Sequence, residues 1–149
     1  MLNTVVNAVT PWVNPVIDYH ALAPEMVLAA GLCVVLLADL FMDESRKWII
    51  SSLAGFTLLG AMLPVLTLGL HDTDVRSMFD GRYVVDNFSL VIKALFLLAG
   101  YVVVLLSSNH VEEDEYWRGE YYFLLLSSIL GMVMISSSRD LVSIFVALE

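Results

Sequence analysis

Long uncharged apolar runs alternate with short polar links along most of the 149-residue chain. The longest runs have about 20 residues, and an α-helix of that length spans a hydrocarbon core of roughly 30 Å. Backbone polar groups must be paired inside a bilayer, and a helix pairs them within one segment. The pattern therefore predicts an all-α, polytopic membrane protein with four complete spans and the start of a fifth. The expected spans cover residues 21–42, 48–70, 87–108 and 121–138, and the fifth starts over residues 141–149.

Two polar stretches outside these spans carry further structural signals. Residues 1–20 are mildly apolar but interrupted by two prolines and several polar residues, which predicts an arm at the membrane surface. The arm has neither the positive start nor the small-residue cleavage site of a signal peptide. In the loop of residues 71–86, Asp80-Gly81 is a turn signal, and the following Tyr83-Val84-Val85 is expected to be extended.

Composition and charge exclude several classes of function. The chain is 59% hydrophobic with a mean hydropathy of +0.82, too apolar for an ordinary soluble domain. Its formal net charge of −9 includes no basic cluster that could follow a phosphate backbone, so no nucleic acid partner is expected. The single cysteine, Cys33, cannot form an internal disulfide. No phosphate-binding glycine motif, metal-ligand spacing or nucleophile–base pair is present, so we expect no cofactor or metal site in this chain.

The basic residues give a weak prediction of orientation. Arg46 and Lys47 favour a cytoplasmic location for the first link, which places the N-terminus outside. Arg118 falls on the same side, whereas three other arginines fall on the opposite side, so the totals are three and three. The prediction therefore depends on the short, doubly charged first link.

Glu149 is the first candidate functional residue. It lies nine residues beyond Asp140, which is interpreted as the interfacial start of the fifth helix. Nine residues of helix rise by roughly 13 Å, which would bring Glu149 close to the middle of a bilayer. An ionisable group at that depth is costly and indicates a functional site. The fifth apolar segment is too short to span, so the chain is interpreted as a fragment of a longer protein.

Lys93 is the second candidate, and two interpretations of it are open. It lies roughly 10 Å along the third helix from Asp86, so its stem could carry the ammonium to the interface. Alternatively, Lys93 is a buried charge paired with a carboxylate. The third and fifth helices enter from the same side, and Lys93 and Glu149 lie at similar depths. We therefore hypothesise that Lys93 is the charge partner of Glu149, and that the pair allows Glu149 to take up and release protons.

The end of the chain resembles a known family. The run from Gly119 to Met132, the pair Asp140-Leu141 and the pair Leu148-Glu149 resemble the fourth and fifth helices of subunit N of bacterial NADH–quinone oxidoreductase, respiratory complex I. Two less specific similarities are Leu22–Phe41 and the stretch from Lys93 to Leu98. The resemblance covers most of residues 21–149.

The resemblance implies an antiporter-like subunit built from inverted repeats, of which this chain would be the N-terminal fragment. It implies that Glu149 is a proton-transfer residue. The usual lysine partner of that glutamate lies on a later helix, so the pairing with Lys93 comes from the residues alone. FMN, iron–sulfur clusters and quinone are implied for partner subunits and not for this chain. Other membrane subunits of complex I, the lipid bilayer and a bacterial cell membrane location are also implied.

The expected function is thus that of a membrane subunit of a proton-pumping NADH:quinone oxidoreductase, a translocase whose redox sites lie elsewhere. One alternative is a subunit of a related multi-subunit sodium/proton antiporter. Another is a scaffold that holds neighbouring subunits and moves nothing. Replacing Glu149 with Gln separates transport from scaffolding, because only a transport role predicts that pumping fails while assembly continues.

Overall fold

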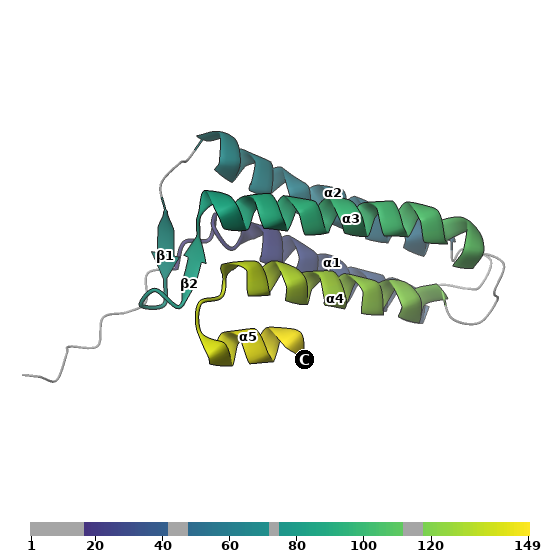
Figure 1. Cartoon of the computed structure of the whole chain (residues 1–149). Coiled ribbons are helices and arrows are strands. Elements are labelled where there is room, and N and C mark those ends of the chain that lie inside the picture. Colours follow the sequence, from purple (N-terminus) through teal and green to yellow (C-terminus); the bar gives the residue numbers. More distant parts are fainter. Residues whose placement is uncertain (1–16, 42–47, 72–74, 112–117) are drawn as a thin grey trace, which may run out of the picture.

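The computed structural model describes residues 17–41, 48–71, 75–111 and 118–149, which form five helices and a two-stranded hairpin (Figure 1). The elements are α1 (Ala23–Phe41), α2 (Trp48–His71), β1 (Arg76–Met78), β2 (Tyr83–Val85), α3 (Asn87–Val111), α4 (Arg118–Ser137) and α5 (Leu141–Leu148). In the described part of the chain, four helices are long and apolar enough to cross a membrane. The eight-residue α5 is too short to do so. The predicted all-α polytopic architecture is confirmed.

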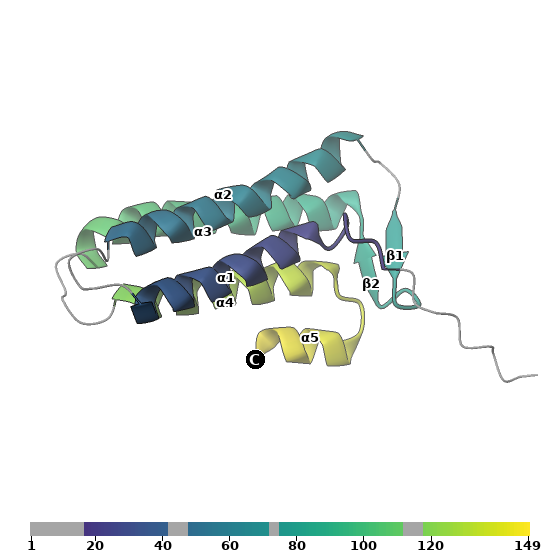
Figure 2. The ribbon, with the colours of Figure 1, turned by 180° about the vertical axis from the view of Figure 1, so that it is seen from behind.

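The four long helices form a closed ring. Helix α1 packs against α2 and α4, and α3 packs against the same two helices from the other side. Figures 1 and 2 show α1 beside α4 in one layer, with α2 and α3 above them, and α5 folding back along α4. Helices α1, α3 and α5 all begin at the end of the bundle where the hairpin lies. The prediction that the third and fifth helices enter from the same side is therefore confirmed.

Aliphatic side chains fill the interior of the ring. Leu28, Leu58, Leu97, Leu126 and Ile129 contribute from all four long helices, and each is at most 1% exposed. The outer surface is also apolar. Exposed large hydrophobic side chains include Phe41, Leu70, Leu106 and Leu141. Such a surface is unfavourable in water but suits a lipid environment, in which every backbone polar group is already paired inside a helix.

The hairpin closes one end of the bundle. Strands β1 and β2 pair antiparallel, with Arg76 opposite Val85 and Met78 opposite Tyr83. The turn between them has three consecutive positive φ angles, of which Gly81 adopts +80° without a steric penalty. Tyr83 of β2 also forms an isolated antiparallel bridge with Ser138, and β2 contacts α3 and α4. The expected turn at Asp80-Gly81 and the expected extended segment are both confirmed.

Asp86 fixes the point at which α3 begins. Its carboxylate accepts a hydrogen bond from the Ser89 backbone N–H at 2.8 Å, and the Asp86 N–H donates to Ser89 Oγ at 2.9 Å. This reciprocal pattern is a capping box, which satisfies two backbone donors at the start of a helix. The Ser89 N–H also holds the pKa of Asp86 below its usual value. The cap sets the register of α3, and with it the position of Lys93.

A few boundaries differ from the prediction. Helix α4 begins at Arg118 instead of residue 121, and α3 extends to Val111 instead of residue 108. Both helices continue into polar residues, because a helix does not have to stop where the apolar run stops. Residues 1–16 of the expected arm, and Arg46 and Lys47, lie outside the described residues, so the predicted orientation stays a prediction.

Candidate functional site

Three segments that are distant in sequence bring polar side chains together at the hairpin end of the bundle. Glu25 comes from the first turn of α1, Lys93 from the second turn of α3 and Tyr83 from the start of β2. Lys93 is fully buried, and Glu25 and Tyr83 are 6% and 7% exposed. Charged groups are almost never this buried unless they are paired. We call these three residues the Glu25 cluster.

The polar atoms of the Glu25 cluster form a closed triangle of hydrogen bonds. The Lys93 ammonium donates to Glu25 Oε1 at 2.6 Å and to the Tyr83 hydroxyl oxygen at 3.0 Å. The Tyr83 hydroxyl donates in turn to the same Glu25 oxygen at 2.5 Å. Each pair of groups is thus linked directly, and Tyr83 is both an acceptor and a donor.

This geometry decides between the two interpretations of Lys93. The ammonium is buried inside the protein and paired with a carboxylate. Helical side chains point back toward the N-terminus of their helix, so the Lys93 stem reaches toward the start of α3, where α1 also begins. Removing one partner of such a pair leaves an uncompensated buried charge, which typically costs about 3–5 kcal/mol.

The predicted pairing of Lys93 with Glu149 is wrong. Helix α5 packs against α4, and in the described residues it makes no contact with α3. Lys93 and Glu149 lie at similar depths along their helices, but α3 and α5 are not neighbours. The ring of α1 to α4 closes around Lys93 and leaves α5 outside. The partner of Lys93 is Glu25.

Glu149 lies instead in a groove between α4 and α5. The groove has a volume of about 470 Å³, and its lining includes Ser127, Ser128 and Glu149. The Glu149 N–H donates to the Phe145 carbonyl at 3.3 Å, so the helical hydrogen-bond pattern of α5 reaches this residue. Eight residues separate it from Leu141, a rise of roughly 12 Å. Glu149 is exposed in the groove, so its environment differs from that of buried Glu25.

Gly131 sets the distance between the two helices of this groove. A Cβ atom added to it would lie 2.5 Å from the Ala147 carbonyl oxygen on α5. Only glycine therefore allows α5 to approach α4 this closely, as expected from the small residues Ser127 and Gly131 on one face of α4. The position of Glu149 beside α4 depends on that approach.

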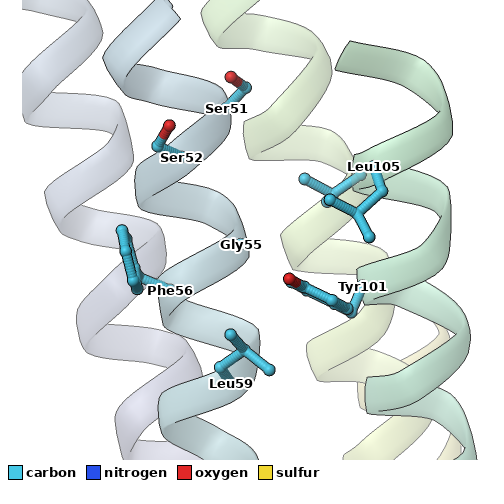
Figure 3. Close-up of a pocket in the computed structure, with 8 residues that line it drawn as sticks. Ser51, Ser52, Gly55, Phe56, Leu59, Tyr101 and Leu105 are labelled. Atoms are coloured by element: carbon cyan, nitrogen blue, oxygen red, sulfur yellow. The ribbon is translucent and has the colours of Figure 1, made fainter.

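A second groove, between α2 and α3, has a different character (Figure 3). Ser51, Ser52, Gly55 and Phe56 of α2 and Tyr101 of α3 line a space of about 250 Å³. Its lining contains hydroxyls and apolar groups but no carboxylate or amine. It therefore offers no group that exchanges protons near neutral pH, and we do not place the functional site there.

Two further features of the Glu25 cluster bear on its chemistry. Burial and the adjacent Glu25 carboxylate both raise the pKa of the Tyr83 phenol above its usual value, so the hydroxyl keeps its proton and remains a donor. The second carboxylate oxygen, Glu25 Oε2, is buried and accepts no hydrogen bond from any described residue. A buried polar atom left unpaired in this way typically costs about 1–3 kcal/mol.

The sequence analysis missed Glu25 and Tyr83 as site residues. A glutamate in the first turn of a helix is favoured by the helix dipole, and a tyrosine is common in a strand, so neither residue type signals a site at its position. A signal was available: the first and third helices also enter from one side, so a carboxylate near the start of one can meet an amine near the start of the other. No group of three or more His, Cys, Asp or Glu that could hold a metal ion occurs in the ranges that the structure covers.

The chain was compared with known proteins, and no family model matches it. It is 33% identical over 132 residues to NADH-quinone oxidoreductase subunit N of Thioalkalivibrio sulfidiphilus, covering 89% of this chain and 27% of that protein. The subunit N of Anoxybacillus flavithermus is 37% identical over 134 residues, covering 89% and 26%. Subunit N 2 of Streptomyces griseus is 36% identical over 143 residues, covering 93% and 26%.

The similarity extends over almost all of the chain but only part of each relative. The chain spans about a quarter of the length of the curated relatives it matches. Several relatives that carry the same name agree in identity and coverage. Over about nine-tenths of its length, this multi-pass membrane chain therefore resembles NADH-quinone oxidoreductase subunit N.

Proposed function

We propose that the chain forms part of a membrane subunit of NADH–quinone oxidoreductase and contributes a segment of a proton translocation path. The names of its relatives and its four membrane-spanning helices support this proposal. Electron transfer, with FMN, iron–sulfur clusters and quinone, takes place in partner subunits. The other membrane subunits of the complex are the direct partners. The subunit lies in the bacterial cell membrane, with its N-terminus outside.

The observation that carries the proposal is the position of Glu149. The carboxylate lies roughly 12 Å along α5, in a groove that also exposes the hydroxyl-bearing Ser127 and Ser128. An ionisable group at membrane depth is costly, and such residues usually mark ion or proton pathways. A carboxylate that is exposed in a groove containing hydroxyl groups can accept a proton and release it again.

The test replaces Glu149 with Gln in the complete subunit, within its assembled complex. Gln has the same size but cannot carry a proton as a carboxyl group does. Proton pumping by membrane vesicles is measured together with NADH–quinone reductase activity and the amount of assembled complex. We expect assembly to persist while pumping falls by at least tenfold. Normal pumping by Glu149→Gln would contradict the proposal and would indicate that the subunit is a scaffold.

Asp140→Asn is the matched control. Asp140 is the N-cap residue of the same helix, and Asn is an equally good residue at that position. The control removes a carboxylate from α5 without changing the depth or the groove of Glu149. It should assemble and pump as the unaltered subunit does.

The partner assignment is tested by mild-detergent purification of the complete subunit. Recovery of partners that oxidise NADH supports the proposal. Recovery of sodium/proton antiporter subunits without NADH oxidation would contradict it.

A further inference from the structure

The proposed function uses Glu149 and leaves the most buried charges of the bundle unexplained. Glu25 comes from the first turn of α1 and Lys93 from the second turn of α3, whereas Glu149 follows α5, which packs against α4 outside the ring. Figure 1 shows that α1 and α3 begin at the hairpin end of the bundle. A pair that served only to hold the helices together would need each polar atom to have a partner. The Glu25 cluster does not meet that condition.

The hydrogen bonds of Glu25 are distributed unevenly between its two oxygens. Oε1 accepts from both the Lys93 ammonium and the Tyr83 hydroxyl. Oε2 is buried but has no partner in the described part of the chain. The residue as a whole is only 6% exposed, so Oε2 is an acceptor directed into the protein interior.

Ser137 supplies a second unsatisfied group beside the same cluster. It lies at the end of α4, is 2% exposed, and interacts with the Tyr83 phenol. Its Oγ atom makes no well-formed hydrogen bond to any described residue. Buried polar groups without protein partners are the usual binding sites of internal water, which typically makes about three hydrogen bonds. Glu25 Oε2 and Ser137 Oγ therefore supply a polar environment for such a water.

Two further ion pairs lie at this end of the bundle. Asp18 forms an ion pair with Arg76 of β1, and Asp86 pairs with Arg139 at 3.5 Å. The side chains of all four residues are at least 24% exposed, so neither pair is buried as Lys93 and Glu25 are. Among the described residues, the Lys93 ammonium and the Glu25 carboxylate are therefore the buried pair of opposite charge.

We propose that Glu25, Lys93 and Tyr83 form a second, hydrated proton-exchange site at the hairpin end of the bundle. A proton carried by water adds to Glu25 Oε2 and leaves the carboxyl neutral. Lys93, having lost its counter-charge, releases one proton from Nζ to water. The carboxyl group of Glu25 then turns about its Cγ–Cδ bond, so that the protonated oxygen faces Tyr83. Glu25 donates this proton to the Tyr83 oxygen while Tyr83 donates its own proton to Lys93, which restores the carboxylate, the phenol and the ammonium. One proton enters and one leaves in each cycle.

Tyr83 has the geometry that this transfer requires. Its oxygen lies 2.5 Å from Glu25 Oε1 and 3.0 Å from Lys93 Nζ, within hydrogen-bond distance of both groups. It already accepts from Lys93 and donates to Glu25, so once the protonated carboxyl oxygen faces Tyr83, a reversal of both hydrogen bonds passes a proton to Lys93. This inference rests on the proposed proton-translocating function, and it assigns that function a second site.

The test uses Tyr83→Phe and Glu25→Gln in the complete subunit, within its assembled complex. Tyr83→Phe retains the ring and the ion pair but removes the bridging hydroxyl. We expect each variant that assembles to lose at least threefold in the initial rate of proton pumping. Asp86→Asn is the control, because it removes a carboxylate at the same end of the bundle while Asn still caps α3. The control should pump normally.

A second readout does not depend on pumping. Infrared difference spectra of the purified complex, recorded between neutral and acidic pH, should show a protonated-carboxyl band that Glu25→Gln removes and Asp86→Asn retains. Absence of such a band would overturn the proposal. Normal pumping by Tyr83→Phe would also overturn it, and would identify the cluster as a structural ion pair.

Glu149→Gln, measured in parallel, separates the two proposals. If Glu149→Gln stops pumping while Tyr83→Phe pumps normally, the proposed function holds and the second site is wrong. If Glu149→Gln pumps normally, the proposed function fails, and the infrared band of Glu25 still decides whether its carboxyl exchanges protons.

Discussion

Glu25 and Glu149 are both carboxylates in helices that begin at the hairpin end of the bundle, but their surroundings differ completely. Glu25 lies inside the ring of α1 to α4, 6% exposed, with an ammonium and a phenol on one oxygen. Glu149 lies outside the ring, in a groove with serine hydroxyls. Glu25 lies in the first turn of α1, whereas Glu149 directly follows the last residue of α5. The helices that surround each carboxylate decide whether its charge is paired inside the protein.

The two sites should therefore differ in how strongly they affect stability and proton transport. The Glu25 cluster joins α1, α3 and the hairpin, so a change there should affect both stability and any proton exchange. The Glu149 groove involves only α4 and α5, so removal of its charge should affect transport and leave the ring intact. The following predictions test this difference, from the largest expected effect to the smallest.

The largest effect is expected for Lys93→Met. It leaves the Glu25 carboxylate buried without its counter-charge, which should cost about 3–5 kcal/mol in the free energy of unfolding. Unfolding of the complete subunit in detergent measures this, and we expect the amount of assembled complex to fall as well. The double variant with Glu25→Gln should recover most of the loss, because both charges are then absent. Normal stability of Lys93→Met alone would contradict the buried pair.

A smaller loss is expected for Tyr83→Phe. The hydroxyl hydrogen-bonds to two charged groups, and such bonds contribute about 1.5–3 kcal/mol. Tyr101→Phe is the matched control, because its hydroxyl lies at the groove between α2 and α3 and outside the cluster. Equal stability of the two variants in the same unfolding measurement would count against the closed triangle.

The α4–α5 contact is tested by Gly131→Ala. The added methyl group meets the Ala147 carbonyl oxygen at 2.5 Å, so α5 must shift, at a cost of about 1–3 kcal/mol. Gly69→Ala is the control, because nothing lies within 4 Å of its added Cβ, and Ala favours a helix. The melting temperature should fall for the first variant and stay equal or rise for the second. A rise for both would show that α5 does not pack as described.

The smallest effect concerns the pH dependence of the cap on α3. The pKa of Asp86 is lowered in the folded protein from its usual 3.8, chiefly by the Ser89 N–H. A depressed carboxyl pKa stabilises the fold above the unfolded value, and this contribution is lost as the pH falls through the folded value. Asp86→Asn should therefore abolish part of the stability loss below about pH 4, and should cost less than about 1 kcal/mol at neutral pH. An unchanged acid dependence of unfolding would refute the role of this cap.

The fold was largely predictable because its signals are local. The lengths of the uncharged runs set the number of spans, and Asp80-Gly81 set the turn of the hairpin. Even the common starting side of α3 and α5 follows from counting crossings. These properties depend on single segments or on their order, so the sequence alone contains them.

The site was predictable only in part, because pairing across helices depends on which helices are neighbours. Lys93 was recognised as a possible buried charge, but the similar depths of Lys93 and Glu149 led to the wrong partner. The choice required knowing that α1 to α4 close into a ring and exclude α5. Tyr83 was missed for a related reason, since a tyrosine in a polar loop gives no sign that it will be folded over the end of a bundle.

The most direct test of this account is a pair of double-mutant cycles on the unfolding of the complete subunit. One cycle combines Lys93→Met with Glu25→Gln, and the other combines Lys93→Met with Glu149→Gln. The first should show a coupling energy of at least about 2 kcal/mol, and the second should be additive within about 0.5 kcal/mol. Strong coupling between Lys93 and Glu149, with additivity between Lys93 and Glu25, would contradict the assignment of the buried pair.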